Sequence, residues 1–292
     1  MQAYHSLKLP DGRLLSLQTP KVMGILNVTP DSFYDGGRYD SRQAAVDRAG
    51  KMLEEGADLL DIGGYSTRPG ADDIPQEEEQ QRVLQALEPI LEAFPNAIIS
   101  IDTFRASVAK AAVQQGAHAI NDISGGSLDE KMFATVGELG VPYFLMHTRG
   151  TPQTMKTLTQ YDNLLNELLD YFQERLLQLR NPGVKDVIID PGFGFAKTLD
   201  QNYELLAQLE HLQMLGCPLL VGVSRKSMVY KKLGTSAQEA LNGTTALHIL
   251  SLQQGANILR VHDPKEAEEA ITLFQSFQDA KKATLQRVAF LS

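Results

Sequence analysis

Short apolar runs, each followed by a polar or glycine-rich loop and then by a helical pattern, recur along the chain. The runs are rich in Val, Ile and Leu and almost uninterrupted, which is typical of strands buried on both faces of a parallel sheet. They cover residues 22–28, 58–63, 97–102, 119–121, 141–147, 187–190, 219–224 and 258–262. The pattern therefore predicts eight parallel strands.

The segments between these runs carry apolar residues at helical spacing. The first such stripe consists of Ala45, Val46, Ala49, Met52 and Leu53, and similar stripes lie within 83–91, 164–176 and 267–274. Strands that alternate with helices in this way predict a single (β/α)8 TIM barrel of the α/β class. A doubly wound open sheet is an alternative that the pattern alone leaves open.

Residues 1–20 do not fit the repeat. Two short apolar stretches, 4–9 and 14–17, flank Asp11-Gly12, and this arrangement predicts a β-hairpin that covers the bottom of the barrel. We therefore expect one domain over 1–292, with the hairpin in 1–20, the barrel in 21–281 and a C-terminal tail in 282–292.

The composition of the chain argues against several classes of binding partner. The 27 Lys and Arg against 36 Asp and Glu give a formal net charge of −9, which argues against binding nucleic acid or anionic lipid through a broad basic surface. No stretch reaches the roughly 18 apolar residues of a membrane span, and residues 1–10 do not resemble a signal peptide. The single cysteine, Cys217, excludes an intramolecular disulfide and a cysteine-cluster metal site. We expect a cytoplasmic protein.

Polar residues stand where each predicted strand ends, which is where a barrel carries its chemistry. They are Asn27, Asp61, Asp102, Asn121 with Asp122, His147, Asp190, Ser224 with Arg225 and Lys226, and Arg260 with His262. A single polar strand end is as well explained by loop capping. Polar groups at all eight ends favour an active site.

The charges at these ends fall into two groups. Asp102 and Asp190 offer carboxylates for paired N–H groups of a heterocycle, whereas Lys226, Arg260 and His262 are cations or potential cations suited to phosphate oxygens. This mixture of carboxylates and cations does not fit a glycosidase, whose catalytic pair of carboxylates has no use for the cations. We expect the bulk negative charge to lie on outer helices, for example at 77–79 and 266–269.

Two long loops, 27–37 and 63–71, have glycines near their ends and carry Phe33 and Arg68, which is typical of loops that close over a substrate. The Gly-x-Gly at 192–194 lacks the third glycine of a dinucleotide fingerprint and is weak evidence for a nucleotide site.

Seven motifs, taken in order from Gly24 to Asp263, resemble those of the dihydropteroate synthase family of pterin-binding barrels. They are Asn27-Val-Thr-Pro-Asp-Ser-Phe, Ser66-Thr-Arg-Pro-Gly-Ala, Ser100-Ile-Asp-Thr, Asn121-Asp-Ile, Asp190-Pro-Gly-Phe-Gly-Phe, Ser224-Arg-Lys-Ser and Arg260-Val-His-Asp. The resemblance implies a transferase of folate biosynthesis. Such an enzyme condenses 6-hydroxymethyl-7,8-dihydropterin diphosphate with p-aminobenzoate and releases pyrophosphate.

The resemblance also implies roles for individual residues. Asp102, Asn121, Met146, Asp190, Lys226 and Arg260 would bind the pterin. Asn27, Arg68, Arg260 and His262 would bind the diphosphate, with Mg²⁺ at Asn27. Thr67, Pro69, Phe195, Ser227 and Phe33 would line the p-aminobenzoate pocket, where sulfonamides compete. The catalytic set would be Asp102, Lys226, Arg260, His262, Arg68 and Asp35. The resemblance further implies a homodimer.

The chain departs from the family pattern at two positions: Tyr65 stands where Glu is common, and Arg149 where a neutral residue is more usual. Two alternatives remain. A methyltetrahydrofolate–corrinoid methyltransferase shares the barrel but has no need of the diphosphate cations. A non-catalytic pterin-binding paralogue would be expected to lose loop residues or the Arg260 and His262 pair, and this chain retains them.

Overall fold

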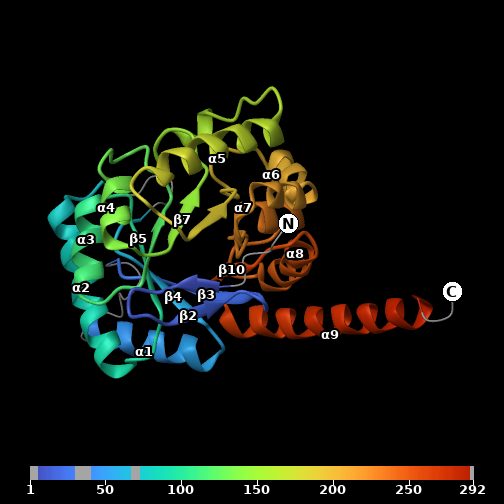
Figure 1. Ribbon diagram of the computed structural model, residues 1–292, viewed down its shortest axis with the longest axis horizontal. Helices are drawn as coiled ribbons and strands as arrows, with labels where there is room; N and C mark the ends of the chain where they lie inside the picture. Colours follow the sequence, from blue (N-terminus) through green and yellow to red (C-terminus); the bar gives the residue numbers. More distant parts are fainter. Residues whose placement is uncertain (1–5, 30–40, 67–72, 290–292) are drawn as a thin grey trace.

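Eight parallel strands form a barrel in the computed structural model, which describes residues 6–29, 41–66 and 73–289 (Figure 1). The strands are β3 (Lys21–Asn27), β4 (Leu59–Gly63), β5 (Ile99–Asp102), β6 (Ala119–Asp122), β7 (Tyr143–Met146), β8 (Val187–Asp190), β9 (Leu220–Val221) and β10 (Ile258–Val261). Their order is β8-β7-β6-β5-β4-β3-β10-β9. A parallel bridge between Ile189 and Leu219 joins the two ends of this sheet. The predicted barrel is confirmed, and the doubly wound alternative is wrong.

Helices follow the strands and cover the outside of the barrel (Figure 1). They are α1 (Ser41–Glu54), α2 (Gln76–Ala93), α3 (Ala106–Gln114), α4 (Met132–Leu139), α5 (Leu164–Arg180), α6 (Leu199–Ala207), α7 (Ser227–Leu233), α8 (Leu241–Gln253) and α9 (Pro264–Ala289), with 3-10 turns η2 (Met155–Thr157) and η3 (Leu209–Leu215). Thr198 and Gln201 form a capping box at the start of α6. Figure 1 shows the C-terminal part of α9 running away from the barrel. In the described ranges, no helix is long and apolar enough to cross a bilayer.

Most strands are shorter than the apolar runs predict, because turn hydrogen bonds occupy the ends of the runs. The N–H of Ala97 donates to the carbonyl of Phe94 (2.9 Å), so Ala97 belongs to a turn and β5 begins two residues later. The strand β9 comprises only Leu220 and Val221. It lies between β8 and β10, where the barrel closes, and pairs with β10 through two residues.

The amino end of the barrel is filled by the N-terminal hairpin, as predicted. Strands β1 (Ser6–Lys8) and β2 (Leu14–Ser16) pair antiparallel around Gly12, whose φ of +90° suits glycine. Leu7, Leu15 and Leu17 are buried among the inward residues of the barrel strands. Those inward residues are Met23, Leu59, Ala119, Phe144, Ile188, Leu220 and Ile258. With this end packed by apolar side chains, polar chemistry is confined to the carboxyl end.

One acidic residue of the cluster at 77–79 does not contribute to the surface charge. Glu79 lies on the outer helix α2, as predicted, but its side chain is completely buried. It accepts hydrogen bonds from Thr103 Oγ1 (2.5 Å) and Arg105 Nη1 (2.8 Å). A buried carboxylate requires such partners, and both come from the segment between β5 and α3, which the local helical pattern cannot reveal.

Candidate active site

A buried network centred on Arg260 links four strands at the carboxyl end of the barrel. Arg260, on β10, donates from Nε to Asp61 Oδ2 on β4 (2.7 Å) and from Nη2 to Asp102 Oδ2 on β5 (2.6 Å). Asn121, on β6, donates from Nδ2 to the same oxygen of Asp61 (2.8 Å). The structure therefore brings together three of the predicted pterin residues: Arg260, Asp102 and Asn121.

Asp61 is the residue of this network that sequence reasoning left without a role. It stood among the polar strand ends, but its carboxylate is completely buried and joins Arg260 to Asn121. The signal that could have found it is a lone acid inside the apolar run Leu59-Leu60-Asp61-Ile62, because an acid in such a run needs a buried cation.

In this network, burial and the neighbouring charges shift the pKa values in opposite directions. Burial raises the pKa of Asp102 to about 7, with Arg260 acting to lower it and Asp61 acting to raise it. Burial would lower the pKa of Arg260, but the carboxylates of Asp61 and Asp102 outweigh it and hold that pKa above its ordinary value. Arg260 is therefore charged and anchored, whereas Asp102 can change its protonation near neutral pH.

Two acceptor oxygens of the network are not used in its hydrogen bonds. Asp61 Oδ1 and Asn121 Oδ1 are buried, and neither has a hydrogen-bond partner among the described residues. Unpaired buried acceptors are uncommon in proteins and call for an explanation. A ligand that brings N–H donors to this end of the barrel would supply one.

Lys226 and Asp190 form the second charged part of the site. The ammonium of Lys226 donates to the carbonyl of Phe193 (2.6 Å) and lies 4.8 Å from the centre of the Phe195 ring. Burial lowers the pKa of Lys226 to about 8, against the attraction of Asp190. Burial raises the pKa of Asp190, whose Oδ1 accepts from the N–H of Gly192 (2.8 Å).

Two glycines, Gly222 and Gly63, leave space in which the charged side chains of the site lie close together. A Cβ on Gly222 would lie 3.6 Å from Lys226 Nζ and 3.9 Å from the Cβ of Arg260. A Cβ on Gly63 would lie 3.5 Å from both Asn27 Oδ1 and the Cβ of Asp102. The bare backbone at Gly222 and Gly63 thus leaves the site open between neighbouring strands.

His262 directly follows β10 and lies beside Ser224. Its Nδ1 lies 3.1 Å from Ser224 Oγ, which also accepts from the N–H of His262 (3.1 Å). Burial, reinforced by Arg260, lowers the pKa of His262 to about 4. The imidazole is therefore neutral at pH 7, so His262 is a potential cation, whereas Arg260 is a permanent one.

The remaining predicted residues divide between described and undescribed parts of the chain. Met146 is buried opposite Asp190 in the β7–β8 register, Ser227 is half-buried at the first position of α7, and Asn27 ends β3. Five predicted residues lie outside the described residues: Phe33, Asp35, Thr67, Arg68 and Pro69.

The comparisons with known proteins agree with this geometry. A family model described as "Pterin binding enzyme" matches residues 23–262. The dihydropteroate synthase of Escherichia coli K12 is 43% identical over 274 residues, which cover 93% of this chain and 96% of that protein. The chain belongs to the dihydropteroate synthase family. It is accordingly a transferase, and the methyltransferase and non-catalytic alternatives are not supported.

Solved structures of the family match over nearly the whole barrel. A Xanthomonas albilineans dihydropteroate synthase with 4-aminobenzoic acid superposes with a TM-score of 0.88 and 41% identity, covering 94% of this chain and 98% of that one. A Yersinia pestis dihydropteroate synthase in a sulfonamide drug complex gives a TM-score of 0.88 and 40% identity, covering 94% and 99%.

The two departures from the family pattern both contact neighbouring loops. Tyr65 donates to Asp73 Oδ1 (3.2 Å), and its ring lies edge-on to Phe104, with centroids 5.0 Å apart. Arg149 forms an ion pair with Glu167 and lies 3.8 Å above the ring of Tyr161. Neither side chain is part of the Arg260 network.

Some polar strand ends have structural roles. The carboxylate of Asp122 accepts from the N–H and hydroxyl of Ser124 (both 2.7 Å), the N–H of Gly126 (2.8 Å) and the hydroxyl of Tyr143 (2.7 Å). Arg225 pairs with both oxygens of Asp263 (2.7 and 2.8 Å). Asp122 and Arg225 therefore hold their own loops in place, and neither is part of the Arg260 network.

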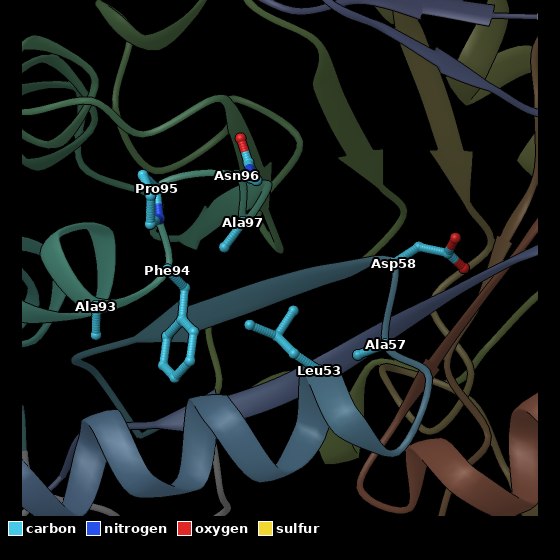
Figure 2. Close-up of a pocket in the computed structure, with 8 residues that line it drawn as sticks. All are labelled: Leu53, Ala57, Asp58, Ala93, Phe94, Pro95, Asn96 and Ala97. Carbon is cyan, nitrogen blue, oxygen red and sulfur yellow. The ribbon is translucent and has the colours of Figure 1, made fainter.

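A hollow at the opposite end of the barrel is not a candidate site. Figure 2 shows it between α1 and the turn that follows α2, near the amino ends of β4 and β5. It is lined by Leu53, Ala57, Asp58, Ala93, Phe94, Pro95, Asn96 and Ala97. The carboxylate of Asp58 already accepts from Lys21 Nζ (2.8 Å) and from the N–H of Val22 (2.9 Å). Asp58 therefore has a structural role, joining the start of β4 to β3.

Proposed function

We propose that the carboxyl end of this barrel condenses 6-hydroxymethyl-7,8-dihydropterin diphosphate with p-aminobenzoate, giving 7,8-dihydropteroate and pyrophosphate in folate biosynthesis. The observation that carries the proposal is the Arg260 network with its two unpaired acceptors, Asp61 Oδ1 and Asn121 Oδ1, beside Lys226 and Asp190. A pterin edge presents N–H groups and ring acceptors side by side, and this set of carboxylates, amide and ammonium complements them.

The pterin lies, on this proposal, between β5, β6, β8 and β10. Asp102, Asp190 and Asn121 accept from its N–H groups, and Lys226 donates to its ring acceptors. Arg260 covers one face of the ring and Met146 the other, since a guanidinium stacks on a flat ring and a thioether packs against one. Asp61 holds Arg260 in place for this task.

The diphosphate lies near the ends of β3 and β10, held by Arg260, His262 and Arg68. Asn27 presents an amide oxygen beside Asp102 and Gly63, a hard donor of the kind that Mg²⁺ prefers. The described residues hold no group of three His, Cys, Asp or Glu side chains suited to a metal ion. An ion there would be held chiefly by phosphate oxygens and water, with Asn27 as a protein ligand. Bound there, Mg²⁺ would offset the negative charge of the leaving group.

The p-aminobenzoate pocket would be lined by Phe195 and Ser227, with Phe33, Thr67 and Pro69 from the two loops, and sulfonamides would occupy the same pocket. The ring of Phe195 lies against the Lys226 ammonium, so this pocket adjoins the pterin.

The reaction needs charge balance and positioning more than a strong base. The bond between the pterin methylene carbon and the diphosphate oxygen breaks, and its electron pair leaves with the diphosphate. Asp102 and Asp190 stabilise the positive charge that develops on the pterin. The amine nitrogen of p-aminobenzoate then forms the new C–N bond and loses a proton. Because this amine is uncharged at neutral pH, orientation beside the carbon supplies most of the advantage. Arg68 and Asp35 would assist from their loops, which we expect to close over the substrate and to exclude water from the cation.

We also propose that the protein acts in the cytoplasm as a homodimer. The homodimer rests on the family resemblance, and the compartment rests on the sequence expectation stated above. Analytical ultracentrifugation of the purified protein would test the oligomeric state.

The deciding experiment is incubation of the purified protein with the dihydropterin diphosphate, p-aminobenzoate and Mg²⁺, followed by measurement of pyrophosphate and dihydropteroate. We expect both products in equal amounts, with formation blocked by a sulfonamide. Pterin binding without products would favour the non-catalytic alternative. Methyl transfer from methyltetrahydrofolate to a reduced corrinoid, without condensation, would favour the methyltransferase.

A further inference from the structure

The segment between β8 and α6, residues 191–198, has an unusual backbone that runs along the proposed substrate pockets. Gly192, Gly194 and Ala196 have φ values of +71°, +80° and +49°. Ala196 carries a side chain in this left-handed region, where a residue other than glycine is strained. Such a backbone cannot pair as a strand or a helix, so its polar groups need partners from side chains.

Lys197 supplies two of those partners, one near each end of the segment. Its side chain is buried, and Nζ donates to the carbonyls of Gly192 (3.1 Å) and Phe195 (3.1 Å) and lies 3.0 Å from His147 Nδ1. An ammonium has three N–H donors, and all three have an acceptor here. One side chain thus joins the beginning and the end of the segment to the end of β7.

The fit between the segment and β7 leaves little room for movement. A Cβ on Gly192 would lie 2.0 Å from the carbonyl oxygen of His147, so the two backbones are in direct contact. Other side chains also hold the segment: Tyr161 donates its hydroxyl to the carbonyl of Ala196 (2.9 Å), and Asn202 Oδ1 accepts from the N–H of Gly194 (2.6 Å). Lys226 donates to the carbonyl of Phe193 (2.6 Å). Each of these side chains bonds a single residue of 192–196, whereas Lys197 spans from Gly192 to Phe195 and reaches His147.

We infer that Lys197 is a positioning residue for p-aminobenzoate: it holds the 191–198 segment in the conformation that places Phe195 as a wall of the pocket. This inference rests on the function proposed above. Asp190 depends less on Lys197, since β8 pairs with β7 as far as Asp190. The effect should therefore fall on p-aminobenzoate more than on the pterin.

The charges around Lys197 support a role that depends on its hydrogen bonds. Burial lowers the pKa of Lys197 to about 7; Asp190 acts to raise it, and Lys226 and Arg149 act to lower it. His147 is neutral, because burial and the nearby Lys197 lower its pKa well below the ordinary value. Its Nδ1 can therefore accept from Lys197. A deprotonated Lys197 retains two N–H donors for three acceptors, so the segment should loosen as pH rises above about 7.

The test compares Lys197→Met with Lys185→Met, which makes the same change at an exposed lysine near the start of β8. We expect Lys197→Met to raise the KM for p-aminobenzoate about tenfold, with the KM for the pterin diphosphate changed less than about threefold. Lys185→Met should change neither. The milder Lys197→Gln, which keeps an amide donor, should show the same selectivity to a smaller degree.

The comparison of the two KM values decides whether Lys197 positions the pocket. A selective rise in the KM for p-aminobenzoate supports the inference, and the increase should shrink in Lys197→Gln. Equal changes in both KM values, or a lower active fraction with both KM values unchanged, would overturn it, because Lys197 would then serve only the fold. If Lys197→Met does not fold, Lys197→Gln decides by the same criterion. Absence of product from the unmodified protein would instead count against the proposed function.

Discussion

The two ends of the barrel differ in how their polar groups are paired. At the amino end, the apolar hairpin fills the interior and the surrounding charges are paired: Arg13 with Asp11 (2.6 Å) and Lys21 with Asp58 (2.8 Å). At the carboxyl end, Arg260 holds two buried carboxylates, and Asp61 Oδ1 and Asn121 Oδ1 lack partners within the described residues.

The difference separates the part of the molecule that maintains the fold from the part that binds. Buried polar groups without partners destabilise a folded protein, so the carboxyl end is held together at some cost in stability. The apolar packing of the hairpin at the amino end offsets that cost. Substitutions at the two ends should therefore affect different measurements, and this separation can be tested.

The largest expected effect on turnover comes from Arg260→Met. The change leaves Asp61 and Asp102 buried without their cation, which typically lowers the free energy of unfolding by about 3–5 kcal/mol. It also removes a group that contacts the pterin and the diphosphate, so kcat/KM should fall about 1,000-fold. Steady-state kinetics and urea unfolding would measure the two effects.

Arg13→Met is the matched change at the amino end. The partly exposed Arg13–Asp11 pair should contribute about 1 kcal/mol or less, and kcat/KM should be unchanged. Comparable losses of turnover in the two variants would show that the ends of the barrel are not functionally separate.

The next effect is a bell-shaped dependence of kcat/KM for the pterin diphosphate on pH. Asp102, whose pKa burial raises to about 7, must be ionised, so activity should fall as pH drops through that value. Lys226, whose pKa burial lowers to about 8, must be protonated, so activity should also fall as pH rises through that value. The optimum should lie between the two. Lys226→Gln should be less active at every pH and should lack the alkaline fall; a fall that persists would assign it to another group.

A smaller effect is expected from His262→Asn, which retains an acceptor or donor near Ser224 but loses the titratable ring. Since the pKa of His262 is about 4 in the free protein, binding of the diphosphate should raise that pKa and take up a proton. Calorimetry of pyrophosphate binding in buffers with different ionisation enthalpies would detect this uptake. The variant should lose the proton uptake and about 10- to 100-fold in kcat/KM. Equal proton uptake in both proteins would exclude His262 as its source.

The smallest effect on turnover is expected at the hairpin. Leu7→Ala empties a fully buried position among the inward residues of the barrel and should lower the free energy of unfolding by about 2–5 kcal/mol. Leu14→Ala, in the same hairpin but 67% exposed, should have little effect on stability. Neither should change kcat/KM at a temperature where both are folded. A loss of activity in Leu7→Ala under those conditions would mean that the amino end influences the site.

Much of this architecture could be predicted before any coordinates. The eight apolar runs and the hairpin follow from residue periodicity and turn chemistry, which act over a few residues. The positions of Asp102, Asn121 and Arg260 follow as well, because the carboxyl ends of parallel strands meet at one face. Seven motifs in chain order pointed to the family that the comparisons support.

What could not be predicted are the pairings and charges that arise between distant parts of the chain. Asp61 and Arg260 are 199 residues apart in sequence yet 2.7 Å apart in space. The burial of Glu79, the neutrality of His262 and the three contacts of Lys197 likewise depend on neighbours from other strands and loops. Periodicity and strand order are properties of the local sequence, whereas hydrogen-bond partners and pKa values depend on which surfaces the closed barrel brings together.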